Sequence, residues 1–147
     1  MSDAQSSRNT GRSILAVVAG ILAGIALTLV TDTALHKIGF FPSLGEWTPS
    51  GPLAVATAYR IVYSILGSYI VARLAPNRPM MHAFISGAIG VVASAVGAAA
   101  TWNKNFGPHW YPVALILTAL PCAWAGAKIR LVQLRALESS PSTQRGT

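Results

Sequence analysis

The sequence is poor in charge and especially poor in acid. Of its 147 residues, 10% are charged and four are acidic, while 52% are hydrophobic. A soluble globular chain carries roughly a quarter charged residues. Mean hydropathy is +0.50 over the whole chain, loops included, and the long apolar runs lack the regular polar face of a soluble surface helix. The composition therefore favours a chain surrounded by lipid.

Cysteine and catalytic motifs are also scarce. The one cysteine, Cys122, excludes an internal disulfide, a CxxC redox pair and a cysteine-based zinc site. No GxSxG, Walker loop, HExxH or catalytically spaced carboxylate pair occurs. Asp32, His36 and His109 are metal-ligand types, but their spacing does not indicate a metal site. We therefore expect no enzyme activity, no metal and no cofactor.

Four apolar segments are each close to the ~20 residues that a helix needs to cross a bilayer. They cover about 13–33, 53–74, 81–101 and 111–131. The predicted fold class is an all-α integral membrane four-helix bundle, with the membrane domain at 13–131. Residues 1–12 are predicted to be a disordered lead-in, and 132–147 a tail that starts as an amphipathic extension. A secretory signal peptide is the competing interpretation of the first segment, although no small-x-small cleavage site follows it.

Basic residues predict the orientation, because cytoplasmic loops accumulate Lys and Arg. One side of the predicted membrane domain holds Arg8, Arg12, Arg73, Arg78, Lys128, Arg130, Arg135 and Arg145. The other side holds Lys37 and Lys104. The bias predicts a multi-pass protein of the cell inner (plasma) membrane with both termini in the cytoplasm. It also accounts for the net charge of +7, so we expect no nucleic-acid partner.

Small residues recur four apart in three of the segments. The tracks are Ala16, Gly20 and Gly24; Gly90, Ser94 and Ala98; and Ala119, Ala123 and Ala127. Such tracks let helix backbones approach closely within a membrane. We favour packing within the bundle over self-association, which the same tracks could also serve.

A single charged residue lies well inside a span. Arg60 is about 10 Å along the second segment at 1.5 Å per residue, where an isolated charge costs about 2.5–3.5 kcal/mol at mid-membrane on insertion scales. The nearest acid in the same leaflet is Asp32, and His36 follows one helical turn later. The predicted site comprises Asp32, His36, Tyr59, Arg60, Tyr63, Trp102 and His109, all toward the extracytoplasmic side.

Two roles for this cluster follow from the residue types. One is a structural ion pair between Asp32 and Arg60 that joins the first two helices. The other is a pocket that binds a small anionic or amphipathic ligand through Arg60, or relays protons through Asp32 and His36. The sequence leaves both open.

Several runs of sequence carry a resemblance to a known group. They are TDTALHKIGFFP, AYRIVYSILGSYIVARLAPNRPMMHA, ATWN and GPHWYPVALILTALPCAW. Together they resemble uncharacterised small bacterial inner-membrane proteins with four predicted helices, over about residues 13–131. The resemblance implies a bacterial membrane location and no particular activity. Small multidrug resistance transporters and vitamin K epoxide reductase-like proteins differ, because the first need a glutamate within the first helix and the second need cysteine pairs.

The functional expectation is an accessory or structural membrane protein. It follows from the absence of catalytic motifs and the abundance of small-residue tracks. Its expected partners are the lipid bilayer and, through those tracks, other membrane proteins or a second copy of the chain. The alternative is a small transporter or ligand-binding protein that uses the Asp/Arg/His cluster.

Overall fold

Four helices make up the fold. A computed structural model of the chain describes residues 2–139, with side chains from residue 10 onward. The helices are α1 (Ser2–Lys37), α2 (Ser50–Leu74), α3 (Pro79–Thr101) and α4 (Trp110–Ser139), and the described residues contain no strand. All four are long and apolar enough to span a membrane, which confirms the predicted all-α bundle of membrane-compatible helices.

Two predicted boundaries differ from the structure. Residues 1–12 were predicted to be disordered, but α1 is helical from Ser2. Once a helix is nucleated, each added residue costs little, so the apolar part of α1 can propagate its helix through this polar segment. At the other end, α4 continues past 131 to Ser139. Met1 and the rest of the predicted tail, 140–147, lie outside the described residues.

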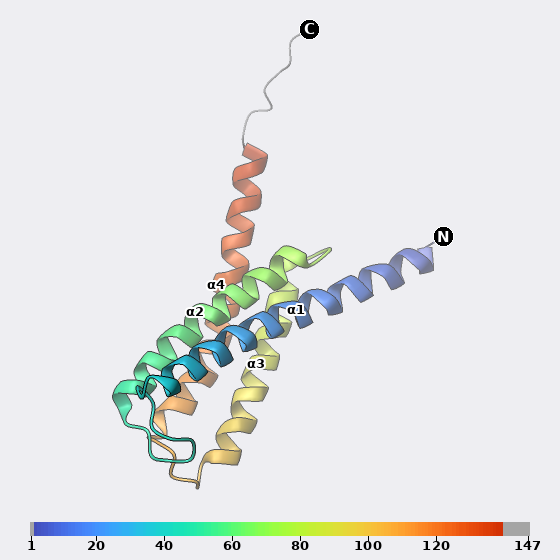
Figure 1. Ribbon diagram of the computed structural model, residues 1–147. Helices are drawn as coiled ribbons and strands as arrows, with labels where there is room; N and C mark the ends of the chain where they lie inside the picture. The colour runs from blue at the N-terminus through green and yellow to red at the C-terminus, as the bar shows by residue number, and fades with distance from the viewer. Residues whose placement is uncertain (1, 140–147) are drawn as a thin grey trace.

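Successive helices run in opposite directions (Figure 1). The longer loops, between α1 and α2 and between α3 and α4, meet at one end of the bundle, here called the loop end. The N-terminus of α1, the short α2–α3 turn and the C-terminal part of α4 lie toward the opposite end, the terminal end. At the loop end, the backbone N–H of Thr48 donates to the carbonyl of Phe106 at 2.8 Å, which joins the two long loops.

Local sequence explains where the helices stop. α1 ends in a Schellman motif, in which the N–H of Phe40 donates to the Leu35 carbonyl and that of Gly39 to the His36 carbonyl. Gly39 has φ +74°, a conformation that glycine adopts without steric cost. The second helix ends before Pro76, and α3 begins with Pro79 at its first position, where a missing N–H is tolerated.

Helix packing depends on small residues at close crossings. A Cβ on Gly20 would lie 2.4 Å from the Gly67 carbonyl oxygen, and one on Gly87 would lie 2.6 Å from the Cβ of Ala123. Gly20 and Ala123 belong to the predicted small-residue tracks, so these tracks pack within the bundle. Gly67 and Gly87, which also lie at the close crossings, are not part of the predicted tracks. Contacts are densest in α2·α4, α3·α4 and α1·α2.

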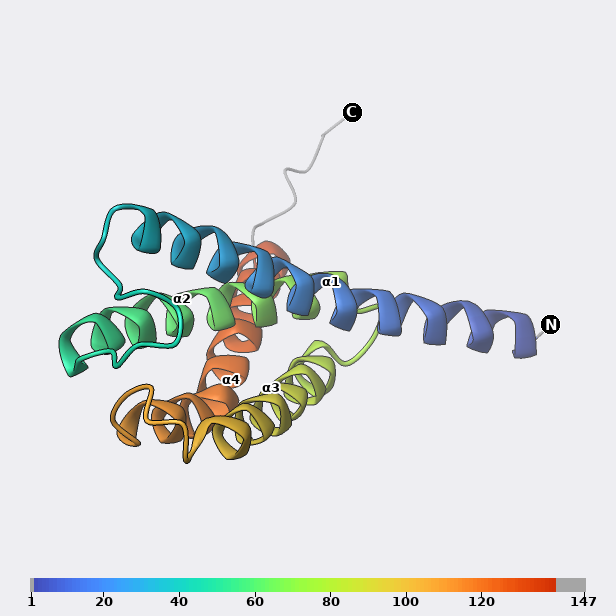
Figure 2. The same ribbon diagram turned by 60° about the horizontal axis from the view of Figure 1, so that its bottom comes forward.

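The first helix is the least enclosed of the four. It packs mainly on α2 and contacts α3 far less, and among the described residues no Cα atom of α1 lies within 8 Å of a Cα atom of α4. Figure 2 shows that α1 lies along α2 and that α3 diverges from α1. Two cavities lie between α1 and the other helices, with residues of all four helices in their walls.

Candidate functional site

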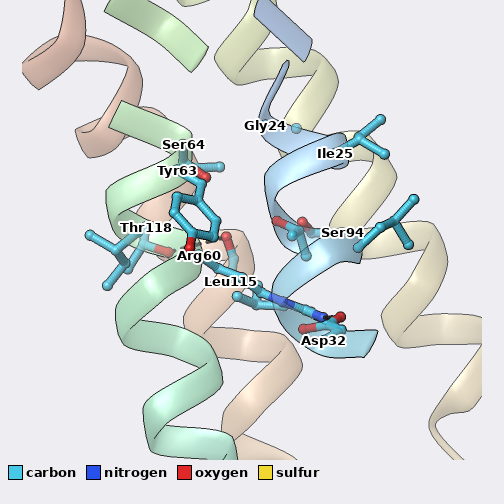
Figure 3. A pocket seen from close by; sticks show the side chains of 14 residues that line it. Gly24, Ile25, Asp32, Arg60, Tyr63, Ser64, Ser94, Leu115 and Thr118 are labelled. Carbon is cyan, nitrogen blue, oxygen red and sulfur yellow. Dashed lines mark hydrogen bonds and ion pairs between the residues drawn. The ribbon is translucent and has the colours of Figure 1, made fainter. Parts of the chain in front are cut away.

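The predicted partner of Arg60 is the one the structure provides. Its Nη2 atom lies 2.7 Å from Oδ2 of Asp32, and the two side chains are 29% and 24% exposed. Asp32 lies little more than one turn before the end of α1, and Arg60 lies ten residues into α2. Figure 3 shows the Arg60 side chain reaching from α2 toward Asp32 on α1. The ion pair joins the two helices near the loop end.

Two tyrosines complete this cluster. Tyr59 donates its hydroxyl to Oδ1 of Asp32, and Nη1 of Arg60 donates to the hydroxyl of Tyr111 at the start of α4. Tyr111 also places its ring 5.7 Å from the guanidinium carbon of Arg60, within cation–π range. Arg60 thus links three helices. Tyr111 is not among the residues that the sequence predicts for the site.

Tyr63 lies beside this cluster without bonding to Arg60. Its hydroxyl is 2.9 Å from the Thr31 hydroxyl on α1, and its ring lies 5.7 Å from that of Tyr59. Thr31 is not among the residues that the sequence predicts for the site. Its position next to Asp32 was the available signal, because a polar side chain at that depth needs a partner.

His36 makes no hydrogen bond to the side chains of the ion pair. Its Nδ1 donates to the backbone carbonyl of Asp32 at 2.8 Å, and its ring lies 5.2 Å from Phe41, just beyond the Schellman turn. The expectation that Asp32 and His36 form a proton relay is not supported by this geometry, because the imidazole bonds to the backbone oxygen rather than to the carboxylate.

Trp102 and His109 form a separate pair at the loop end. Their ring centroids are 4.4 Å apart, and Nε2 of His109 donates to the Trp102 carbonyl at 3.1 Å. Neither makes a hydrogen bond to Arg60. Within the described part of the chain, no three His, Cys, Asp or Glu side chains are grouped so that they could hold a metal ion.

A cavity connects this pair to Arg60. The space, here called the vestibule, has a volume of about 500 Å³ and lies at the loop end. Thr48, Phe106 and His109 line it from the loops, and Arg60 and Tyr111 line it from the helices. Trp102 also lines it, so the structure brings Trp102, His109 and Arg60 to one cavity although they do not bond to one another.

Two further cavities continue from Arg60 toward the terminal end. They have volumes of about 340 and 250 Å³ and share Gly24, Tyr63, Gly90 and Ala119 in their walls, so we treat them as one interhelical groove. All four helices contribute to the groove. Arg60 lines both the groove and the vestibule, whereas Asp32 lines only the groove.

The chain matches no protein family model, no curated protein and no solved structure. Its resemblance to bacterial inner-membrane proteins therefore stays a prediction. The four long apolar helices indicate a multi-pass membrane protein, with a charged cluster and two connected cavities near its loop end.

Proposed function

We propose that the chain lies in the cell inner membrane with its terminal end in the cytoplasm. The support is the distribution of basic residues. Arg12, Arg73, Arg78 and Lys128 lie in or next to helix parts at the terminal end, together with Arg130 and Arg135. At the loop end, the described Lys and Arg residues are Lys37 and Lys104, apart from Arg60 within α2.

Thiol labelling tests this orientation. In a Cys122→Ala background, Glu46→Cys places a thiol in the α1–α2 loop and Asn77→Cys places one in the α2–α3 turn; both positions are exposed. A membrane-impermeant maleimide added to intact cells is expected to label Glu46→Cys at least ten times more than Asn77→Cys. Permeabilised cells should label both, and the opposite preference in intact cells would contradict the proposal.

We further propose that the protein binds a small amphipathic molecule in the membrane rather than catalysing a reaction. The observation that carries this proposal is the position of Arg60, whose side chain lines both a vestibule and an interhelical groove. Binding sites are commonly cavities of about 300–1,000 Å³ with apolar walls and a few polar groups. Charges within a membrane domain also tend to mark ligand or ion pathways.

Mass spectrometry of the protein purified from native membranes in mild detergent tests the proposal. We expect a small molecule to co-purify with the unaltered chain and to be reduced at least ten-fold in Gly90→Leu. Gly90 lines the groove, and a Cβ there meets only an ordinary contact, 3.7 Å from Ala119, so the longer side chain fills space the ligand would need. Val92→Leu on the same helix is the control, since Val92 is 63% exposed and lines neither cavity. Equal recovery from both variants would contradict binding in the groove.

An accessory role is the second candidate function, and the exposed apolar side chains of α1 favour it. This helix packs mainly on α2 and leaves Leu15, Leu22 and Leu29 exposed, a surface that a helix of another membrane protein or of a second copy could cover. The same purification discriminates the two roles. A stoichiometric protein partner or a dimer, with no bound small molecule, would support the accessory role.

A further inference from the structure

The vestibule and the groove differ in charge. Arg60 is the one full charge among the described residues that line the vestibule, and no acidic residue lines it. Asp32 lies on the other side, in the wall of the groove. A ligand group in the vestibule would therefore meet the guanidinium without facing the carboxylate that neutralises it.

The hydrogen bonds around Arg60 leave a surplus of donors. Both carboxylate oxygens of Asp32 already accept bonds, one from Tyr59 and one from Arg60. Arg60 has five N–H donors, and its side-chain bonds go to Asp32 and Tyr111, while its buried Nε atom has no partner. Because the Tyr111 hydroxyl accepts from Arg60, its own proton is free to be donated. Such a site is suited to a group that accepts hydrogen bonds.

The groove is suited to a hydrocarbon chain. Near Arg60 its wall combines apolar and small residues such as Ile25 and Leu29 with hydroxyl side chains such as Thr28 and Thr118. Farther from Arg60 the wall consists mostly of small and apolar residues, among them Gly20, Ile21, Gly67, Gly87 and Ile89. Ser94 and Leu115 line it together with the vestibule, so one molecule can occupy both spaces. With about 340 and 250 Å³ in its two parts, the groove is small for the two chains of a phospholipid.

We propose that the ligand is a single-chain anionic amphiphile. Its phosphate or carboxylate group lies in the vestibule and accepts hydrogen bonds from Arg60 and Tyr111, and its chain lies in the groove. The inference rests on the proposed binding function and adds the sign of the charge, the number of chains and the direction in which the ligand lies. Because hydrogen bonds to an ionised partner are among the stronger ones in proteins, we expect the head group to contribute strongly to affinity.

Three probes test the proposal on the full chain in nanodiscs of zwitterionic lipid. Dodecyl phosphate carries the anion and the chain, inorganic phosphate carries the anion alone, and dodecyltrimethylammonium carries the chain with a cation. We expect dodecyl phosphate to bind at least ten-fold more tightly than either of the others, measured by the shift in melting temperature across a titration. Equal or tighter binding of the cationic probe, or of inorganic phosphate, would overturn the proposal.

Two variants separate the head group from the chain. Gly97 lines the vestibule and a Cβ there meets nothing within 4 Å, so Gly97→Leu should narrow the vestibule without a clash at its Cβ. Gly97→Leu is expected to weaken both phosphate probes, and Gly90→Leu only the one with a chain. Tyr111→Phe, which removes a single hydroxyl, should weaken the binding of dodecyl phosphate about ten-fold, because it removes one hydrogen bond to a charged group. Unchanged affinity in all three variants would place binding elsewhere and overturn the proposal.

These experiments distinguish the assignment of an anionic single-chain ligand from the proposed binding function on which it rests. If a small molecule co-purifies in a Gly90-dependent manner but the cationic probe binds best, the protein binds a ligand and our assignment of its charge is wrong. If nothing co-purifies and no probe binds, the binding function itself fails.

Discussion

Replacing Gly126 with alanine is expected to force α2 and α4 apart. Among substitutions that add a single methyl group to this protein, we expect it to cause one of the largest losses of stability. A Cβ at Gly126 would lie 2.5 Å from the carbonyl oxygen of Ile65 and 2.7 Å from the backbone nitrogen of Tyr69. Both obstacles are backbone atoms of α2, so no side-chain rotation relieves the clash. The helices must move apart along one of the most extensive contacts in the bundle.

The expected cost is about 3 kcal/mol, at the upper end of the range for overpacked cores. It is measured as a lower melting temperature and a smaller monodisperse fraction on size-exclusion chromatography in detergent. Gly97→Ala is the matched control, because it adds the same methyl group to a helical glycine where nothing lies within 4 Å. Alanine is also the better helix former by roughly 1 kcal/mol, so the control should be neutral or stabilising. Equal effects of the two substitutions would show that the α2–α4 crossing has room for a Cβ at Gly126.

Removing one member of the Asp32–Arg60 pair is expected to destabilise the protein far more than removing both. Asp32→Ala leaves the guanidinium at membrane depth with no carboxylate, and breaking a buried pair in this way costs about 3–5 kcal/mol. About a quarter of each side chain is exposed, so solvent or head groups should reduce the cost to about 2–3 kcal/mol. Asp32→Ala combined with Arg60→Met leaves no charge behind and should return to within about 1 kcal/mol of the unaltered protein.

The difference between single and double variants is a coupling energy, obtained from melting curves of all four proteins. Arg73→Met is the control, because Arg73 is exposed at the terminal end and bonds to the hydroxyl of Tyr69 rather than to an acid; its effect should stay within about 0.5 kcal/mol. Additive effects at Asp32 and Arg60 would contradict a structural role for the pair. The double variant also separates stability from binding, since it should fold and yet fail to bind dodecyl phosphate.

The exchanged pair, Asp32→Arg with Arg60→Asp, adds a further comparison to the same series. It restores a salt bridge but places the cation on α1, in the wall of the groove and away from the vestibule. Stability should recover in part, whereas affinity for an anionic amphiphile should not. Recovery of both would mean that the position of the positive charge relative to the vestibule does not matter.

The sequence was sufficient to predict the ion pair, for an energetic reason. A charge within a membrane span needs a partner at its own depth, and Asp32 was the acid that the spans placed near Arg60. His36 shows the limit of this reasoning. Its spacing from Asp32 correctly predicted a shared helix face, but its ring bonds to the Asp32 backbone carbonyl, and no spacing rule separates that acceptor from the carboxylate.

Tyr111 shows a second limit. It is the second residue of α4 and lies 51 residues after Arg60 in the chain. Its hydroxyl reaches the guanidinium only because α2 and α4 pack together. The sequence placed both residues toward the same side of the membrane. It contained no information on how α4 is rotated about its axis, and that rotation decides which aromatic residue of the loop end faces Arg60.

The sequence by itself determined that the chain forms four apolar helices, where α2 and α3 begin and end to within a few residues, and which acid neutralises Arg60. These properties are local or depend on depth alone, because hydropathy, turn residues and the cost of a buried charge can be assigned segment by segment. Only the tertiary structure decided which glycines permit close contact and that Arg60 lies between two cavities. Gly126 and Gly97 look alike along the chain, yet one lies against the backbone of α2 and the other lines the vestibule, because contact between helices depends on their relative rotation and crossing.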